Sequence, residues 1–128
     1  MNLLLDTHIA LWAITDSPKL PSQARKLILS PNTRVWVSAA SVWEISIKHA
    51  LGRGEMPVSS ADALRYFHES GYSLLEITAE HAVAVADLAA HHHDPFDRIL
   101  VAQALVEPMH LITHDAQVGR YSDTIIKV

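Results

Sequence analysis

Residues 3–8 read Leu3-Leu4-Leu5-Asp6-Thr7-His8, a run of three leucines followed directly by an acid. A short apolar run that ends in an acid is typical of a buried strand that stops at the edge of a sheet. A helical pattern over residues 7–14 follows directly, until Ser17-Pro18 breaks it. This part of the chain therefore predicts a strand joined at once to a helix, as in α/β proteins.

Strands and helices continue to alternate to residue 128. Further strands are predicted at residues 34–37, 72–76, 111–113 and 125–128. Further helices are predicted at residues 22–29, 38–51, 60–70, 78–90 and 94–106, with a turn or short helix at 115–119. Helices of this length between strands require parallel pairing with right-handed crossovers. We therefore expect one domain over residues 1–128, a three-layer α/β/α sandwich with a four- to five-stranded, mainly parallel sheet.

The composition is that of a packed globular protein. The chain has 128 residues, of which 49% are hydrophobic, with only 4 Gly and 6 Pro. The absence of cysteine excludes disulfides and thiolate metal sites, and it favours a reducing, cytoplasmic setting. We expect neither a secretion signal nor a membrane span, because no basic leader and no long apolar stretch is present.

The charge balance has the wrong sign for a protein that binds nucleic acid through its overall field. Lys and Arg number 10 against 14 Asp and Glu, a net charge of −4. If four of the acids hold cations, the remaining 14 − 4 = 10 acids balance the 10 bases. The negative excess can then belong to a metal site, where the bound ion reverses the local charge.

Two acids are predicted at the same edge of the sheet. Asp6 follows the first strand directly, and Asp115 follows the strand at 111–113 by two residues. Ligands of open α/β sheets bind beyond the carboxyl ends of the strands, which is where both acids fall. A turn-forming or helix-capping role is the alternative for each of them.

Glu44 is the third candidate. On the helix over residues 38–51 it lies in an otherwise apolar row with Ala40, Trp43, Ile47 and Leu51. A carboxylate in such a row is partly desolvated and needs a partner or a cation. Lys48, four residues further on, is the alternative partner.

Asp97 is the fourth candidate, in the first turn of the helix over residues 94–106. An acid there complements the helix dipole, and Asp94 is placed to cap the same helix. Leu100, Val101, Ala104 and Leu105 follow at helical spacing and turn Asp97 toward the core side. Together the four acids, Asp6, Glu44, Asp97 and Asp115, suit a hard cation with oxygen ligands, Mg²⁺ above all.

Other chemistries have weaker support in the sequence. His91, His92 and His93 lack the i, i+4 spacing of a helical zinc site, and His8 and His114 lie near the proposed acids. No phosphate-binding glycine loop and no serine nucleophile motif is present. Trp12, Trp36 and Trp43 are expected in the core or at an interface, with base stacking as the less favoured alternative.

The order of these motifs resembles that of the PIN-domain ribonucleases, in particular the VapC-like toxins of toxin-antitoxin pairs. The resemblance covers the whole chain. The matching stretches are Leu4 to His8, Ser38 to Ile45, Asp94 to Ala104 and Leu111 to Asp115. The family's acidic quartet then falls on Asp6, Glu44, Asp97 and Asp115, although Asp94 is close enough to compete for the third position.

The resemblance implies metal-dependent hydrolysis of RNA, with Mg²⁺ or Mn²⁺ held by the quartet. It further implies a cytoplasmic homodimer that a cognate antitoxin protein silences by docking near the active site. As a hypothesis, Asp6, Asp97 and Asp115 hold the cation while Glu44 binds it or orients the attacking water. Lys48, Arg53 and Arg98 are candidate phosphate contacts.

Two further functions stay open from the sequence. One is a phosphatase or phosphotransferase with Asp6 as nucleophile, although such enzymes commonly carry a second Asp where this chain has His8. The other is an inactive dimeric interaction module, which the presence of all four acids disfavours.

Overall fold

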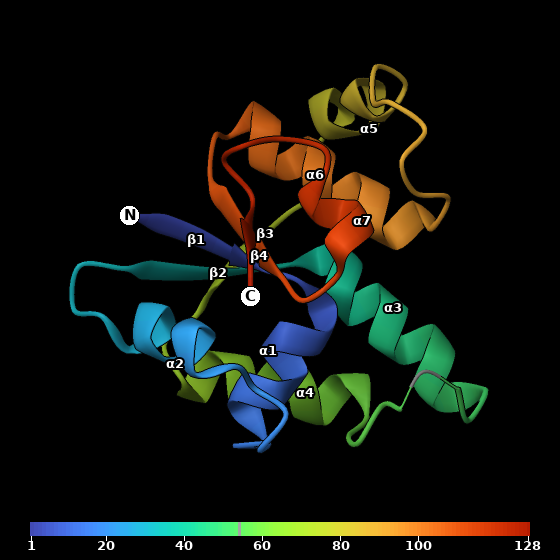
Figure 1. Cartoon of the computed structure of the whole chain (residues 1–128). Coiled ribbons are helices and arrows are strands. Elements are labelled where there is room, and N and C mark those ends of the chain that lie inside the picture. Colours follow the sequence, from blue (N-terminus) through green and yellow to red (C-terminus); the bar gives the residue numbers. More distant parts are fainter. Residues whose placement is uncertain (54) are drawn as a thin grey trace.

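The computed structural model describes residues 1–53 and 55–128. Its strands are β1 (Asn2–Leu5), β2 (Arg34–Ser38), β3 (Ser73–Leu75), β4 (His110–Thr113) and β5 (Ile126–Lys127). Its helices are α1 (Thr7–Ile14), α2 (Ser22–Leu29), α3 (Ala39–Ala50), α4 (Ser60–Glu69), α5 (Ala79–Val85), α6 (Pro95–Val106) and α7 (Ala116–Gly119). Helices cover both sides of the sheet, which confirms the predicted three-layer α/β/α sandwich (Figure 1).

The five strands form one parallel sheet in the order β3-β2-β1-β4-β5. The central strand β1 pairs with β2 on one side and with β4 on the other. The chain therefore crosses over in opposite directions from β1, and the carboxyl ends of β1 and β4 lie at the switch in strand order. Ligand sites of open α/β sheets form at this place.

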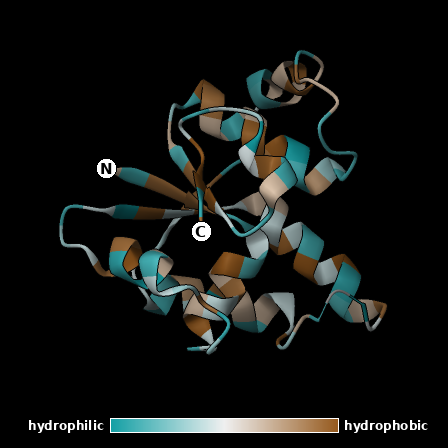
Figure 2. Cartoon of the chain, in the orientation of Figure 1, coloured by the Kyte–Doolittle hydropathy of each residue, from teal (hydrophilic) through white to brown (hydrophobic). Residues whose placement is uncertain are grey.

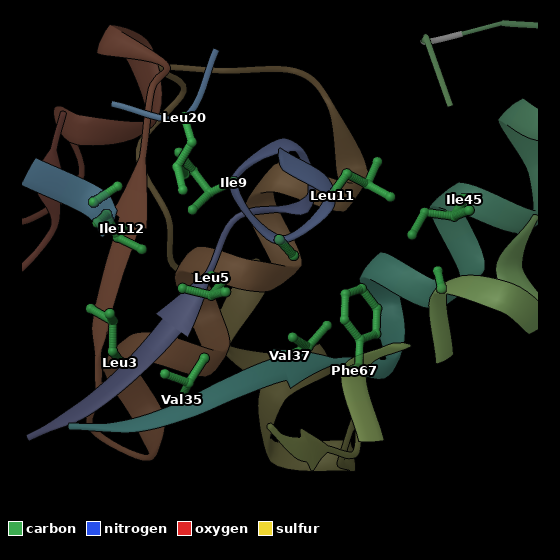
Figure 3. Close-up of a cluster of buried hydrophobic side chains, with 13 residues drawn as sticks. Leu3, Leu5, Ile9, Leu11, Leu20, Val35, Val37, Ile45, Phe67 and Ile112 are labelled. Carbon is green, nitrogen blue, oxygen red and sulfur yellow. The ribbon is translucent and has the colours of Figure 1, made fainter. Parts of the chain in front are cut away.

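The central strand is buried on both faces, which explains its unbroken leucine run. Leu3 and Leu5 pack with residues of α1, α2 and α4, whereas Leu4 packs with residues of α6 on the other face. Figure 3 shows the first cluster, where Phe67 and Ile9 lie against the strands. Hydrophobic residues concentrate on the strands and on the inner faces of the helices (Figure 2).

Helix α5 is shorter than predicted. The sequence predicts a helix over residues 78–90, but α5 ends at Val85, and the next turns are tightened by i to i−3 hydrogen bonds at Asp87 and Leu88. The reason is a tertiary contact. The Arg98 guanidinium donates at 3.1 Å to the carbonyl oxygen of Val85, which in a longer helix would accept from the backbone N–H of Ala89, and at 3.0 Å to the carbonyl oxygen of Ala89.

The apolar row predicted around Glu44 is only partly buried, although Glu44 itself is desolvated as expected. Ala40 and Glu44 are buried, but Trp43 and Leu51 are 59% and 61% exposed, and Ile47 is half-exposed. Helix α3 packs against α4, α6, α1 and β2, and the exposed residues of the row lie where these elements do not cover the helix. No helix in the described part of the chain is long and apolar enough to cross a membrane.

Candidate active site

Four acids from distant parts of the sequence meet in one pocket at the carboxyl edge of the sheet. Asp6 follows β1, Asp115 follows β4, Glu44 lies on α3 and Asp97 lies in the first turn of α6. All four line a pocket of about 390 Å³. The other lining residues are His8, Ile9, Trp12, Lys48, His92, Asp94 and His114. The structure therefore brings together all four acids that were predicted as site residues from the sequence.

Asp6 is fixed by hydrogen bonds to both of its carboxylate oxygens. The backbone N–H of Thr7 donates to Oδ1 at 2.7 Å, and the hydroxyl of Thr113 donates to Oδ2 at 2.5 Å. Burial raises the pKa of Asp6, the charge of Glu44 adds to this, and the two hydrogen bonds oppose it. Thr113 also accepts from the backbone N–H of Asp115 at 3.0 Å, so one threonine links two of the acids.

Glu44 is only 3% exposed, and its two oxygens differ. Oε2 accepts from the ammonium of Lys48 at 2.5 Å, which is the i, i+4 pair that the sequence offers as an alternative. Oε1 is buried in the pocket wall and has no hydrogen-bond partner among the described residues. A buried carboxylate oxygen without a partner costs free energy. The ion pair with Lys48 alone therefore does not explain why Glu44 is buried.

Lys48 is held in place by the acids around it. Burial lowers its pKa, but the hydrogen bond and charge of Glu44, together with the charges of Asp94 and Asp97, raise the pKa overall. The ammonium is therefore charged at neutral pH. It is the one Lys or Arg that lines the pocket among the described residues.

The pKa of Asp97 reflects the burial of this residue and the negative charge of the acids around it. Burial, followed by the charges of Asp6, Asp94, Glu44 and Asp115, raises its pKa to about 8. Its carboxyl group therefore holds a proton at neutral pH unless a cation replaces that proton. Asp94, the competing acid in the sequence, caps α6 by accepting from the backbone N–H groups of Phe96 and Asp97, at 2.8 and 3.3 Å, and lies at the rim of the same pocket.

His92 belongs to the site, although no role for any residue of the histidine run could be predicted from the sequence. Its Nε2 lies 3.2 Å from Oδ2 of Asp97 and 3.2 Å from Oδ2 of Asp115. Its Nδ1 accepts from the backbone N–H of Asp94 at 3.0 Å, so the ring proton resides on Nε2. His92 could be grouped with these two aspartates as a metal ligand. Its protonated Nε2 instead makes it a hydrogen-bond donor that bridges them.

Asp115 has a lowered pKa because several hydrogen-bond donors, His92 among them, stabilise its carboxylate. Burial raises it, but the backbone N–H of Gln117, the His92 ring and the backbone N–H of Val118 all stabilise the charged form and outweigh burial. The first turn of α7 thus holds Asp115 as an anion. The cluster therefore contains one carboxyl group with a lowered pKa, Asp115, and two with a raised pKa, Asp6 and Asp97.

The loop that carries His92 is fastened by Arg98 and Tyr121. Arg98 donates to the carbonyl of His92 at 3.3 Å and to the hydroxyl of Tyr121 at 3.1 Å, and that hydroxyl accepts from the His92 backbone N–H at 2.8 Å. Arg98 therefore serves the loop, not a phosphate as the resemblance suggested. Arg53 lies in a different pocket with residues 49, 52 and 55–57. Of the three predicted phosphate contacts, only Lys48 lines the acidic pocket.

The residues present fit a divalent cation. Carboxylate oxygens are the ligands that Mg²⁺ and Mn²⁺ prefer, and four acids converge here with only one ammonium group to offset them. The unpartnered Oε1 of Glu44 and the raised pKa of Asp97 both indicate an environment that lacks positive charge.

A five-stranded parallel α/β sandwich with a carboxylate-lined pocket at its switch point is the class of protein that the fold and site define. The family model described as "PIN domain" matches residues 3–123. The chain therefore belongs to the PIN-domain family, a family of nucleases. No curated protein matches the chain.

Solved structures share the fold at low sequence identity. A chain of VapBC2 from Rickettsia felis, bound to a DNA fragment from the promoter, is 17% identical with a TM-score of 0.70, covering 100% of this chain and 98% of that chain. A chain of VapBC-1 from nontypeable Haemophilus influenzae is 22% identical with a TM-score of 0.69, covering 100% and 97%. A chain of DNA-bound VapBC from Salmonella typhimurium is 14% identical with a TM-score of 0.68, covering 100% and 97%.

Proposed function

We propose that residues 1–128 form one nuclease domain that hydrolyses RNA phosphodiester bonds with Mg²⁺ or Mn²⁺. The observation that carries this proposal is the convergence of Asp6, Glu44, Asp97 and Asp115 on one pocket in which a buried Glu44 oxygen has no partner among the described residues. Asp6, Asp97 and Asp115 hold the cation, and Glu44 binds it or orients the attacking water.

A divalent ion in this pocket would supply positive charge for the phosphate and lower the pKa of a bound water molecule. The chain's own residues do the positioning. Thr113 aims the Asp6 carboxylate, and the first turn of α7 aims that of Asp115. Lys48, partly exposed at the pocket wall, contacts a phosphate oxygen once the cation neutralises Glu44 in its place.

Cleavage of a single-stranded RNA oligomer tests the proposal. With Mg²⁺ or Mn²⁺ the parent protein should cut the RNA internally, whereas a chelator or Asp6→Asn should abolish cutting. A DNA oligomer of the same sequence tests the preference for RNA. Activity that survives the chelator, or that survives Asp6→Asn, would overturn the proposed mechanism.

The same proteins, assayed on a 5′-phosphorylated oligomer, also test the alternative function as a phosphatase. A phosphatase with Asp6 as nucleophile would release terminal phosphate from a 5′-phosphorylated oligomer and leave its length unchanged. Both oxygens of Asp6 accept hydrogen bonds, which favours a fixed ligand over a nucleophile. Loss of terminal phosphate without shortening would therefore contradict our assignment.

We further propose that the protein is the toxin of a toxin-antitoxin pair, a cytoplasmic homodimer that a cognate antitoxin protein binds. The support is the likeness to chains of VapBC complexes and the exposed apolar side chains of Ile47 on α3 and of Leu51 directly after it, which offer a surface to another protein. Expression alone should arrest growth, and Asp97→Asn should relieve the arrest. Light scattering should give twice the monomer mass for the purified protein. Growth arrest by Asp97→Asn would contradict the proposal that toxicity depends on the acidic pocket.

A further inference from the structure

The pocket has a second wall of different chemistry, built from three rings. His8 and Trp12 come from α1, and His114 directly precedes Asp115. The centroid of the Trp12 ring lies 6.0 Å from that of His8 and 5.8 Å from that of His114. All three residues line the pocket that holds the acids.

This wall is held in place from behind. Trp12 is half-buried and packs against the hydrophobic cluster beneath α1. His8 and Trp12 are four residues apart on α1, so both occupy one face of a helix whose N-cap is Asp6. The His114 ring donates from Nδ1 to the carbonyl oxygen of Val128 at 2.7 Å, which fixes its orientation.

The rings do not stack on one another. The interplanar angle is 53° between His8 and Trp12 and 70° between Trp12 and His114. Rings that meet at such angles are not in parallel stacking contact, and their position beside a proposed cation site suits a ligand that joins a flat ring to a phosphate. A nucleotide has this chemistry, and base stacking on aromatic side chains is the common device of single-strand binding.

We propose that His8, Trp12 and His114 form a nucleobase subsite, with Trp12 as the stacking residue for a base next to the scissile phosphate. This inference rests on the proposed nuclease function. It assigns substrate contact to a wall that carries no carboxylate, and it makes Trp12 a residue that sets affinity for RNA, not the rate of bond cleavage.

The first test measures binding without cleavage. Trp36→Phe combined with Trp43→Phe leaves Trp12 as the sole tryptophan, and its fluorescence is followed with Mg²⁺ present while adenosine or uridine 5′-monophosphate is added. We expect saturable quenching by both nucleotides. Ribose 5-phosphate, which has the sugar and phosphate but no base, should cause none. Equal quenching by ribose 5-phosphate, or no quenching by either nucleotide, would overturn the subsite.

The second test uses RNA cleavage by Trp12→Ala, Trp12→Phe and the control Trp43→Ala. Trp43 is an exposed tryptophan that does not line the pocket. Trp12→Ala should raise the KM by roughly tenfold or more with kcat little changed, whereas Trp12→Phe and Trp43→Ala should stay near the parent. Because Trp12 also packs against the core, each variant is first compared with the parent by thermal unfolding, and the first test retains the native side chain.

The outcomes separate the two proposals. A parent that cleaves RNA while Trp12→Ala keeps the same KM refutes the base subsite and leaves the nuclease assignment standing. A parent that cleaves no RNA but shows base-dependent quenching refutes the nuclease assignment and supports the subsite as a nucleotide-binding wall.

Discussion

The hydroxyl of Thr113 donates a hydrogen bond of 2.5 Å to Oδ2 of Asp6, although the two residues are 107 positions apart along the chain. The contact exists because β1 and β4 are neighbours and place their carboxyl ends side by side. The same hydroxyl accepts from the backbone of Asp115. Thr113 therefore sets the spacing between two of the proposed metal ligands.

Thr113→Val should weaken Mn²⁺ binding by roughly 10- to 100-fold, because valine keeps the shape but cannot hydrogen-bond the ligand. Calorimetric titration with Mn²⁺ measures the change. Thr113→Ser retains the hydroxyl and should bind Mn²⁺ nearly as the parent does. An unchanged Mn²⁺ affinity in Thr113→Val would contradict the positioning role.

Asp97→Asn should change how stability depends on pH in the metal-free protein. The pKa of Asp97 rises from 3.8 to about 8 on folding, so between these values the folded state holds a proton that the unfolded state has released. Stability from this group therefore falls as pH rises through that window, and the penalty is complete above the folded pKa. Asparagine carries no such proton.

Urea unfolding with chelator at pH 5.5 and pH 9 tests this difference. Relative to the parent, Asp97→Asn should gain free energy of unfolding at pH 9 compared with pH 5.5. Subtracting the parent's curve removes the contribution of the other titrating groups. Parallel curves for parent and variant would show that Asp97 is ionised throughout and that the pocket is less crowded with charge than we infer.

Lys48→Met should separate metal binding from RNA cleavage. In the metal-free protein it leaves the Glu44 carboxylate without its partner, which we expect to cost about 1–3 kcal/mol of unfolding free energy. Mn²⁺ should shrink this loss, because the ion replaces the ammonium beside Glu44. By linkage the variant should bind Mn²⁺ more tightly than the parent.

Cleavage by Lys48→Met should nevertheless be slower, because the variant lacks the proposed phosphate contact. Lys48→Arg, which keeps the charge, is the matched control and should show an intermediate rate. If Lys48→Met lost the same stability with and without Mn²⁺, the competition between ammonium and cation for Glu44 would be disproved.

His92 should remain protonated at Nε2 when Mg²⁺ is added. Its Nδ1 accepts from the Asp94 backbone, so the ring cannot present a lone pair at Nε2 without losing that contact. Nitrogen-15 NMR of histidine-labelled protein distinguishes the two ring nitrogens. A deprotonated Nε2 in the Mg²⁺-loaded protein would instead make His92 a metal ligand.

A matched pair of variants checks the same point by affinity. His92→Gln should keep Mn²⁺ binding within about tenfold of the parent, as expected for a residue that only supports the ligands. Asp115→Asn, which removes a proposed ligand, should lose far more. Equal losses would place His92 and Asp115 in the same role.

The local sequence was sufficient for the parts of the fold that depend on neighbouring residues. The predicted helix over residues 7–14 is α1, and the leucines before Asp6 form the central strand, because side-chain alternation and helix caps act over a few residues. Asp6 and Asp115 could be placed at the sheet edge because each follows a strand that an apolar run defines. In the same way, the apolar surroundings of Glu44 marked it as a carboxylate in need of a partner.

Tertiary structure alone decided the features that arise between segments. Thr113 and His92 carried no signal in the sequence, because their significance comes from acids that parallel pairing and a fastened loop bring within hydrogen-bonding distance. The early end of α5 and the contacts of Arg98 have the same origin. The Arg98 side chain, which comes from α6, donates to the carbonyl oxygens of Val85 and Ala89. Spacing along the chain specifies which residues can join a helix or strand, but the charge, burial and proton of each acid depend on neighbours that only the folded chain assembles.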